Sequence, residues 1–317
     1  ACADKLDSDK YFKDRRSLED VFTDKENTEE WLAHAYSFLN GYNLEVSMML
    51  NTITNFADDI YFGGNSLAGY KEFKTGTYNE SYRHSWSESY KGIRQASIFI
   101  QNIDMNTKYT EEERADMKAQ ARFVRAYYYW LLLRRYGPVP IMPDEGVDYT
   151  QSYDQIATPR SSYEEVAQYI SDEMVQATKE LQYDRRTDNY AIGRPTRGAA
   201  LAVRAYALIF AASPFANGNN DEYAQQLVDD EGRRLLSSEY SEEKWAKAAA
   251  AAKDVMDLGV YELYTADRRT TDSPAEPATI NPPYHEVYSN ANYPEGWKDI
   301  DPFESYRSVF NGQIDIL

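Results

Sequence analysis

Aromatic side chains interleaved with Asn and Asp are the residues of this 317-residue sequence that could form a binding site. They gather in two long segments, 55–86 and 280–306. A flat aromatic ring can stack on the apolar C–H face of a sugar ring. Asn and Asp supply partners for the sugar hydroxyls, at roughly 1 kcal/mol net for each hydrogen bond. The two segments therefore indicate a surface for a hydroxyl-rich ligand.

The candidate ligand contacts are aromatic, amide and carboxylate side chains of these segments, with one residue that follows the first predicted helix. They are Asn43, Asp58, Asp59, Tyr61, Asn65, Tyr70, Trp86, Asn292 and Trp297. Trp86 stands where a predicted helix starts beside the first segment, so its ring could serve as a platform or as a packing residue. For each of the other residues, the alternative is an ordinary role in a loop.

The sequence lacks the familiar patterns of catalytic and metal-binding residues. Its three histidines, His34, His84 and His285, have no metal-ligand spacing, and neither a GxSxG nor a P-loop motif occurs. Among 52 carboxylates, a pair such as Asp58-Asp59 arises by chance. A glycosidase with two catalytic carboxylates is therefore only an alternative. We predict no enzyme and no cofactor; without a calcium loop of the EF-hand kind, a structural cation stays undecided.

The single cysteine, Cys2, lies almost at the start of the sequence and precedes a polar, acidic stretch. It can form no disulfide within the chain. One interpretation is a chance free thiol. The other is a bacterial lipoprotein, with Ala1 as the small residue before the cleavage point and the lipid on Cys2. The net charge of −18 disfavours nucleic acid and anionic membrane surfaces as partners.

A mostly α scaffold is predicted to position these residues. Helices are expected over Glu29–Leu39, Ser85–Ile103, Glu111–Tyr136, Ser161–Leu181, Arg197–Ala212 and Glu242–Leu258. The expected helix starts at Ser161 and Thr196 lie about 35 residues apart, near the period of tetratricopeptide repeats. The next start, at Ser241, follows about 45 residues later. We therefore predict a tetratricopeptide-like helical stack. Long loops interrupt it at 51–82, 137–159, 217–237 and 266–306, and loops of this length are usually functional.

The longest predicted helix has clear signals at both ends. Thr110 and Glu113 form a capping box, and Gly137 with Pro138 marks the end. Four arginines limit its apolar run to 126–133, which is far too short to span a membrane. Apolar residues occupy two faces, so we expect the helix to be packed from two sides. The aromatic residues at 127–130 are accordingly predicted to be packing residues.

Five segments of the sequence together resemble the SusD/RagB family of Bacteroidetes surface lipoproteins. In order they are "SWSESYKGIRQASIFIQNID", "AQARFVRAYYYWLLLRRYGPVPIM", "TPRSSYEEVAQYISDEMVQATKEL", "GRPTRGAALAVRAYALIFAAS" and "WAKAAAAAKDVMDLGVYEL". Cys2 followed by Ala3 and Asp4 resembles the lipidated, acidic start of such proteins. The resemblance covers most of the chain up to Tyr264. Family members usually continue through a loop-rich C-terminal part, so the sequence is expected to be an N-terminal portion.

The resemblance implies a SusD-like fold and a non-catalytic binder on the cell surface, anchored by lipid to the outer membrane. Such proteins cover a SusC-type TonB-dependent barrel, capture an oligosaccharide or a peptide, and deliver it for uptake. Abundant Tyr, Trp and Asn favour an oligosaccharide, but a peptide stays open. A helical-repeat scaffold that binds another protein is the second alternative. The expected parts are a lipidated segment over 1–26, a helical domain over 27–265 and a loop-rich start of the ligand-binding region over 266–317.

Overall fold

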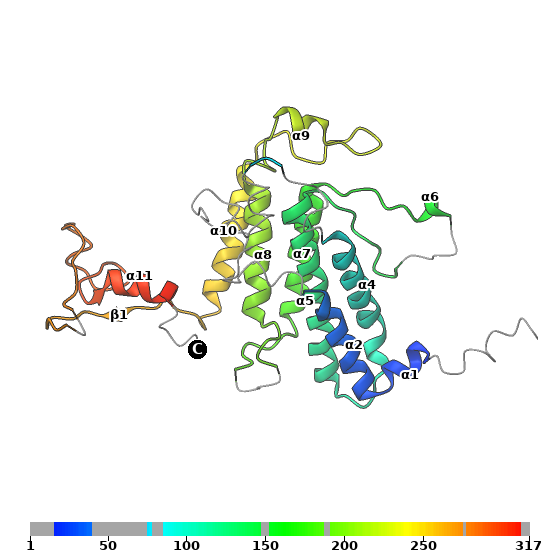
Figure 1. The fold of residues 1–317 in the computed structure, drawn as a ribbon, viewed down its shortest axis with the longest axis horizontal. Coiled ribbons are helices and arrows are strands. Elements are labelled where there is room, and N and C mark those ends of the chain that lie inside the picture. The colour runs from blue at the N-terminus through cyan, green and yellow to red at the C-terminus, as the bar shows by residue number, and fades with distance from the viewer. Residues whose placement is uncertain are drawn as a thin grey trace, which may run out of the picture. The chain divides into compact units, whose positions relative to one another are not determined.

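The computed structural model describes six ranges of the chain and divides it into two compact units. The described residues are 16–39, 75–77, 85–146, 152–186, 191–274 and 277–311. The units are Ala1–Val255 and Met256–Leu317, and each is considered by itself. Figure 1 shows that helices dominate the described part of the chain, as predicted. In the described ranges, no helix is both long and apolar enough to cross a membrane.

The first unit is a stack of helices that follow one another in space as they do in sequence. Its principal helices are α1 (Leu18–Phe22), α2 (Lys25–Ser37), α4 (Trp86–Asn102), α5 (Glu111–Tyr136), α7 (Tyr163–Thr178), α8 (Arg197–Ala212) and α10 (Glu242–Asp257). A short 3₁₀ helix, Ile103–Met105, follows α4, and short α6 (Tyr153–Ile156) and α9 (Glu222–Gln226) lie in connections. Helix α4 packs on α5, α5 packs on α7, and α7 packs on α8 (Figure 1). This is the predicted tetratricopeptide-like arrangement.

The central helix α5 begins and ends where its capping residues predict. The Thr110 hydroxyl accepts a hydrogen bond from the Glu113 backbone N–H at 3.2 Å, and the Glu113 carboxylate accepts the Thr110 N–H at 2.7 Å. At the other end, Gly137 adopts a φ of 69° and donates its N–H to the Leu133 carbonyl at 2.9 Å. Such a positive φ favours glycine, which explains the stop at this residue.

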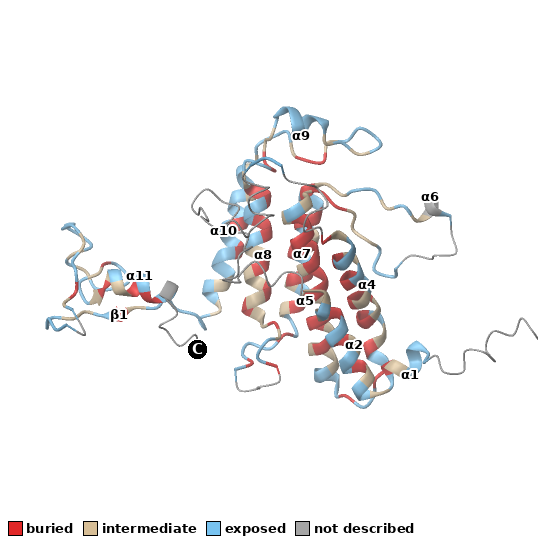
Figure 2. Cartoon of the chain, viewed as in Figure 1, coloured by how far each residue is buried: buried red, intermediate tan, exposed pale blue. Residues whose placement is uncertain are grey.

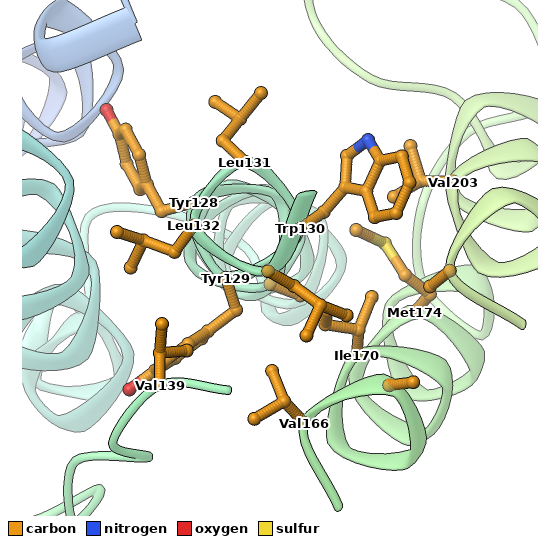
Figure 3. Packing of buried hydrophobic residues seen from close by; sticks show 14 of the residues in the cluster. Tyr128, Tyr129, Trp130, Leu131, Leu132, Val139, Val166, Ile170, Met174 and Val203 are labelled. Atoms are coloured by element: carbon orange, nitrogen blue, oxygen red, sulfur yellow. The ribbon is translucent and has the colours of Figure 1, made fainter. Parts of the chain in front are cut away.

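The core of the first unit surrounds α5, which is buried along most of its C-terminal half (Figure 2). Tyr128, Tyr129 and Trp130 are all buried, while Tyr127 is half-buried. Figure 3 shows Tyr128 on one side of α5, and Tyr129 and Trp130 on the side where Val166, Ile170 and Met174 of α7 lie. A buried aromatic ring contributes a large apolar area to folding. The prediction that this stretch packs a helix from two sides is confirmed.

Two helices begin at residues other than those predicted from the sequence. The Asp24 carboxylate accepts the Asn27 N–H at 3.1 Å, so α2 starts at Lys25, four residues before the expected Glu29. Helix α7 starts at Tyr163 because Ser162, rather than Ser161, supplies the cap. Asp and Ser are both strong N-cap residues, so these shifts follow from ordinary capping chemistry.

The second unit contains a two-residue strand pair and a final helix within a region expected to be mainly loop. Strand β1 (Ala266–Asp267) is antiparallel to β2 (Ile300–Asp301), and α11 (Pro302–Asn311) follows directly. Buried Asp301 joins these elements. Its carboxylate accepts the Glu304 N–H at the start of α11 and the Thr279 hydroxyl, each at 2.8 Å. A single buried carboxylate thereby fixes both the helix start and the loop before the strand.

Candidate functional site

The structure describes three of the predicted ligand contacts. Trp86 belongs to the first unit, whereas Asn292 and Trp297 belong to the second. The remaining candidates lie outside the described residues, and so does the proposed lipidation site; they are Asn43, Asp58, Asp59, Tyr61, Asn65, Tyr70 and Cys2. Their roles stay predictions.

Trp86 is the first residue of α4, and its half-buried ring packs among other side chains. The ring centroid lies 5.1 Å from that of Tyr90 and 5.2 Å from that of Tyr136, which meets it edge-on. The Arg160 guanidinium lies over the ring at 5.8 Å. These contacts show that Trp86 contributes to packing, and they leave part of its surface accessible.

Aromatic residues of the second unit line a groove of about 440 Å³, a size suited to a small ligand. The aromatic lining residues are Tyr264, Tyr288, Tyr293, Trp297 and Tyr306. Leu263, Ile300 and Val309 add apolar surface, and Glu295 and Thr265 add polar groups. The groove therefore combines several ring faces with a few hydrogen-bonding groups, which is the composition expected of a sugar-binding surface.

The wall of this groove that carries Trp297 is a loop held by its own backbone. The Trp297 N–H donates to the Tyr288 carbonyl at 2.9 Å, and the Lys298 N–H donates to the Ala291 carbonyl at 3.0 Å. Gly296 directly precedes the two donors and lies against both acceptor carbonyls. A Cβ atom added to it would come within 2.4 Å of both carbonyl oxygens. Only glycine allows this close approach, which brings Trp297 beside Tyr288.

Tyr288 and Trp297 form a tilted pair at the centre of the aromatic lining. Their ring centroids are 5.4 Å apart and their planes differ by 40°. Trp297 is half-buried, whereas Tyr288 is 47% exposed, so part of the surface of this pair stays accessible to a ligand. Asn292 is exposed and is not among the lining residues, although its carbonyl accepts the Gly296 N–H at 2.9 Å. The structure thus brings Trp297 to the groove and places Asn292 beside it.

Several groove residues were not among the predicted contacts. Tyr288 and Tyr306 belong to the aromatic segment 280–306, so the composition of that segment was a usable signal for them. Tyr264 lies outside the segment and becomes a lining residue only because the chain folds back. No local pattern in the sequence distinguishes it.

One cleft of the first unit has a different chemistry. The cleft between the N-terminal half of α5 and the end of α7 has a volume of about 490 Å³. Four cations line it, namely Arg114, Lys118, Arg122 and Lys179, together with three carboxylates. Among the residues seen to line it, none is aromatic. Across the described ranges, no group of three or more His, Cys, Asp or Glu side chains could hold a metal ion.

Comparison with known proteins gives one consistent family. The sequence model of the SusD-like family described as "starch-binding associating with outer membrane" matches residues 10–207. A SusD-like protein of Bacteroides ovatus is 26% identical over 192 residues, which make up 57% of this chain and 33% of that protein.

Solved structures agree in fold. BT4246 superimposes with a TM-score of 0.61 at 25% identity, over 76% of this chain and 42% of its own. A SusD homolog from Bacteroides thetaiotaomicron gives a TM-score of 0.56 at 21% identity, over 80% of this chain and 45% of its own. The chain therefore spans less than half the length of each of these three relatives.

Proposed function

We propose, from the premise that this chain belongs to the SusD-like family, that it is part of a cell-surface protein that binds oligosaccharides. The family is described as starch-binding and associated with the outer membrane. The observation in the chain itself that supports the proposal is the aromatic groove of the second unit. Its ring faces can stack on sugar C–H faces, while Glu295, Thr265 and the phenol groups can bond hydroxyls.

The proposed role in uptake follows from family membership rather than from the groove. The protein would be anchored to the outer membrane through a lipid on Cys2 and would deliver its ligand to a SusC-type TonB-dependent barrel. Purification of the full-length protein from outer membranes in mild detergent tests this. A barrel protein recovered in stoichiometric amount supports delivery. An unlipidated monomer recovered from the soluble fraction contradicts it and favours the protein-binding scaffold.

Ligand binding is tested by titrating the full-length protein with a panel of oligosaccharides and a panel of peptides. Trp297→Ala and Tyr288→Ala are expected to weaken oligosaccharide binding at least about tenfold, because each removes a stacking face. Tyr223→Ala is the matched control, since Tyr223 is 83% exposed and lies in the first unit. Binding of peptides alone would assign the same role to a different ligand. Release of shorter products from an oligosaccharide would favour the glycosidase alternative.

Trp86 remains a second proposed contact. Because its ring also packs against Tyr90 and Tyr136, Trp86→Ala changes both the packing and the accessible ring face. Trp86→Phe keeps an aromatic ring in this cluster. A contact role predicts that Trp86→Ala weakens oligosaccharide binding at a temperature where the helical stack is intact, and that Trp86→Phe restores most of the affinity. Unchanged affinity in Trp86→Ala would remove Trp86 from the site.

A further inference from the structure

His285 caps the turn that carries Tyr288. Its Nδ1 atom accepts hydrogen bonds from the backbone N–H groups of Val287 and Tyr288, both at 3.3 Å. In return, the His285 backbone N–H donates to the Ser289 hydroxyl at 3.0 Å. The His285 carbonyl also accepts the Ser289 N–H at 3.0 Å. This reciprocal arrangement resembles the capping box of a helix start, with an imidazole in place of a hydroxyl.

His285 holds the Tyr288 ring as well as its backbone. The two rings are stacked, with centroids 4.3 Å apart and planes 22° from parallel. Tyr288 in turn contacts Trp297 through its ring at 5.4 Å and through its carbonyl, which accepts the Trp297 N–H. An unbroken series of contacts therefore runs from His285 through Tyr288 to Trp297.

His285 itself does not line the groove. We infer that it is a positioning residue, which fixes the Tyr288 and Trp297 rings in the orientation that an oligosaccharide meets. This inference rests on the proposed function of the groove. The Nδ1 atom can accept the two N–H groups only while it carries no proton itself. Rings fixed before binding lose less conformational freedom when the ligand arrives.

Three substitutions separate the two contacts of His285. His285→Asn keeps a side-chain acceptor suited to a cap but removes the ring, and His285→Phe keeps a ring but removes the acceptor. His285→Ala removes both. Maltoheptaose, a linear starch oligosaccharide, is the probe. We expect His285→Ala to weaken its binding about tenfold, and each of the other two variants to lie between His285→Ala and the unaltered protein. Binding of His285→Ala equal to that of the unaltered protein would overturn the inference.

A second readout requires no ligand. Fluorotryptophan incorporated at the five tryptophans gives separate fluorine NMR signals, and Trp297→Phe identifies the signal of Trp297. His285→Ala is expected to shift or broaden that signal and to leave the four others unchanged. An unchanged Trp297 signal would show that His285 does not position the ring. If the unaltered protein fails to bind maltoheptaose, or Tyr288→Ala binds it normally, the starch-binding form of the proposed function fails, and the NMR result still decides whether His285 positions the rings.

Discussion

The guanidinium of Arg125 on α5 forms an ion pair with the carboxylate of Glu173 on α7, with 2.6 Å between Nη2 and Oε2. Arg125 is 2% exposed, so its charge lies inside the helical stack. Its other terminal nitrogen lies 2.9 Å from the Asp144 carboxylate and 3.3 Å from the Ser97 hydroxyl. Glu173 also accepts a hydrogen bond from Arg122 at 2.7 Å. One buried charge thus connects α4, α5, α7 and the segment after α5.

Removing the Glu173 charge is expected to destabilise the first unit. In Glu173→Gln, Arg125 keeps a buried positive charge, and Asp144 is its one remaining carboxylate partner within the described ranges. Breaking a buried ion pair from one side costs several kcal/mol, so we expect the free energy of unfolding to fall by roughly 3 kcal/mol. Urea denaturation followed by helical circular dichroism measures this.

Glu88→Gln is the control, because the Glu88–Lys91 pair has the same 2.6 Å separation but is about half exposed. An exposed pair on a helix contributes little, so we expect a change below about 0.5 kcal/mol. Equal effects of the two substitutions would show that burial of Arg125 does not matter.

Gly92 on α4 lies directly against the ring of Tyr128. A Cβ atom at Gly92 would come within 2.4 Å of two ring carbons. Tyr128 cannot move freely, because it is fully buried and its hydroxyl donates to the Ala35 carbonyl at 2.6 Å. Alanine favours a helix over glycine by about 1 kcal/mol, but overpacking and a strained hydrogen bond outweigh that gain. Gly92→Ala should lower the free energy of unfolding by roughly 2 kcal/mol.

Gly193→Ala tests whether this effect comes from the close contact. A Cβ atom at Gly193 meets nothing within 4 Å, and its φ is ordinary. The substitution should leave thermal stability unchanged or raise it slightly. A similar loss of stability in both variants would contradict the steric explanation.

Buried tyrosines predict that the first unit loses stability in alkali. Burial raises the pKa of Tyr129 and that of Tyr163 to about 12, above the ordinary value of 10.0. Burial raises the pKa of Tyr90 and Tyr169 still further. The folded state therefore holds these protons more tightly than the unfolded state. The stability that these buried tyrosines contribute is fully present below pH 10.0 and is lost as the pH rises through about 12.

Tyrosinate absorbance and helical circular dichroism, recorded together from neutral to strongly alkaline pH, check this expectation. The buried tyrosines whose pKa is raised should ionise only as the helices unfold. Tyr129→Phe removes one titrating group and should make the decline in stability with pH less steep. Ionisation of these phenols while the helices remain intact would show that burial does not hold their protons.

Helix ends in the first unit were predictable to the extent that single residues encode them. Thr110, Glu113 and Gly137 fixed α5, and α8 has the expected bounds of Arg197 and Ala212. The start of α2 was missed because Asp24 caps it without a following apolar pattern. The domain limits expected at residues 26 and 265 remain predictions.

The aromatic groove was predictable only in part. Trp297 was identified from the composition of its segment, whereas the contribution of Tyr264 depends on how the chain folds back. The capping role of His285 was not predicted, because imidazole is an unusual cap. Contacts between residues far apart in sequence, or through uncommon cap chemistry, leave no local pattern to recognise.

Gly296 tests whether the backbone of the second unit shapes the groove. In Gly296→Ala the new methyl group would lie 2.4 Å from the Tyr288 and Ala291 carbonyl oxygens. Neither oxygen can withdraw without losing its hydrogen bond from the Trp297 or Lys298 N–H. We expect the loop to open and oligosaccharide affinity to fall more than about tenfold. Helical circular dichroism should remain as in the unaltered protein, because the first unit does not contain this loop. Gly193→Ala serves again as the control, and normal oligosaccharide binding by Gly296→Ala would show that the close approach at Gly296 is not required for the site.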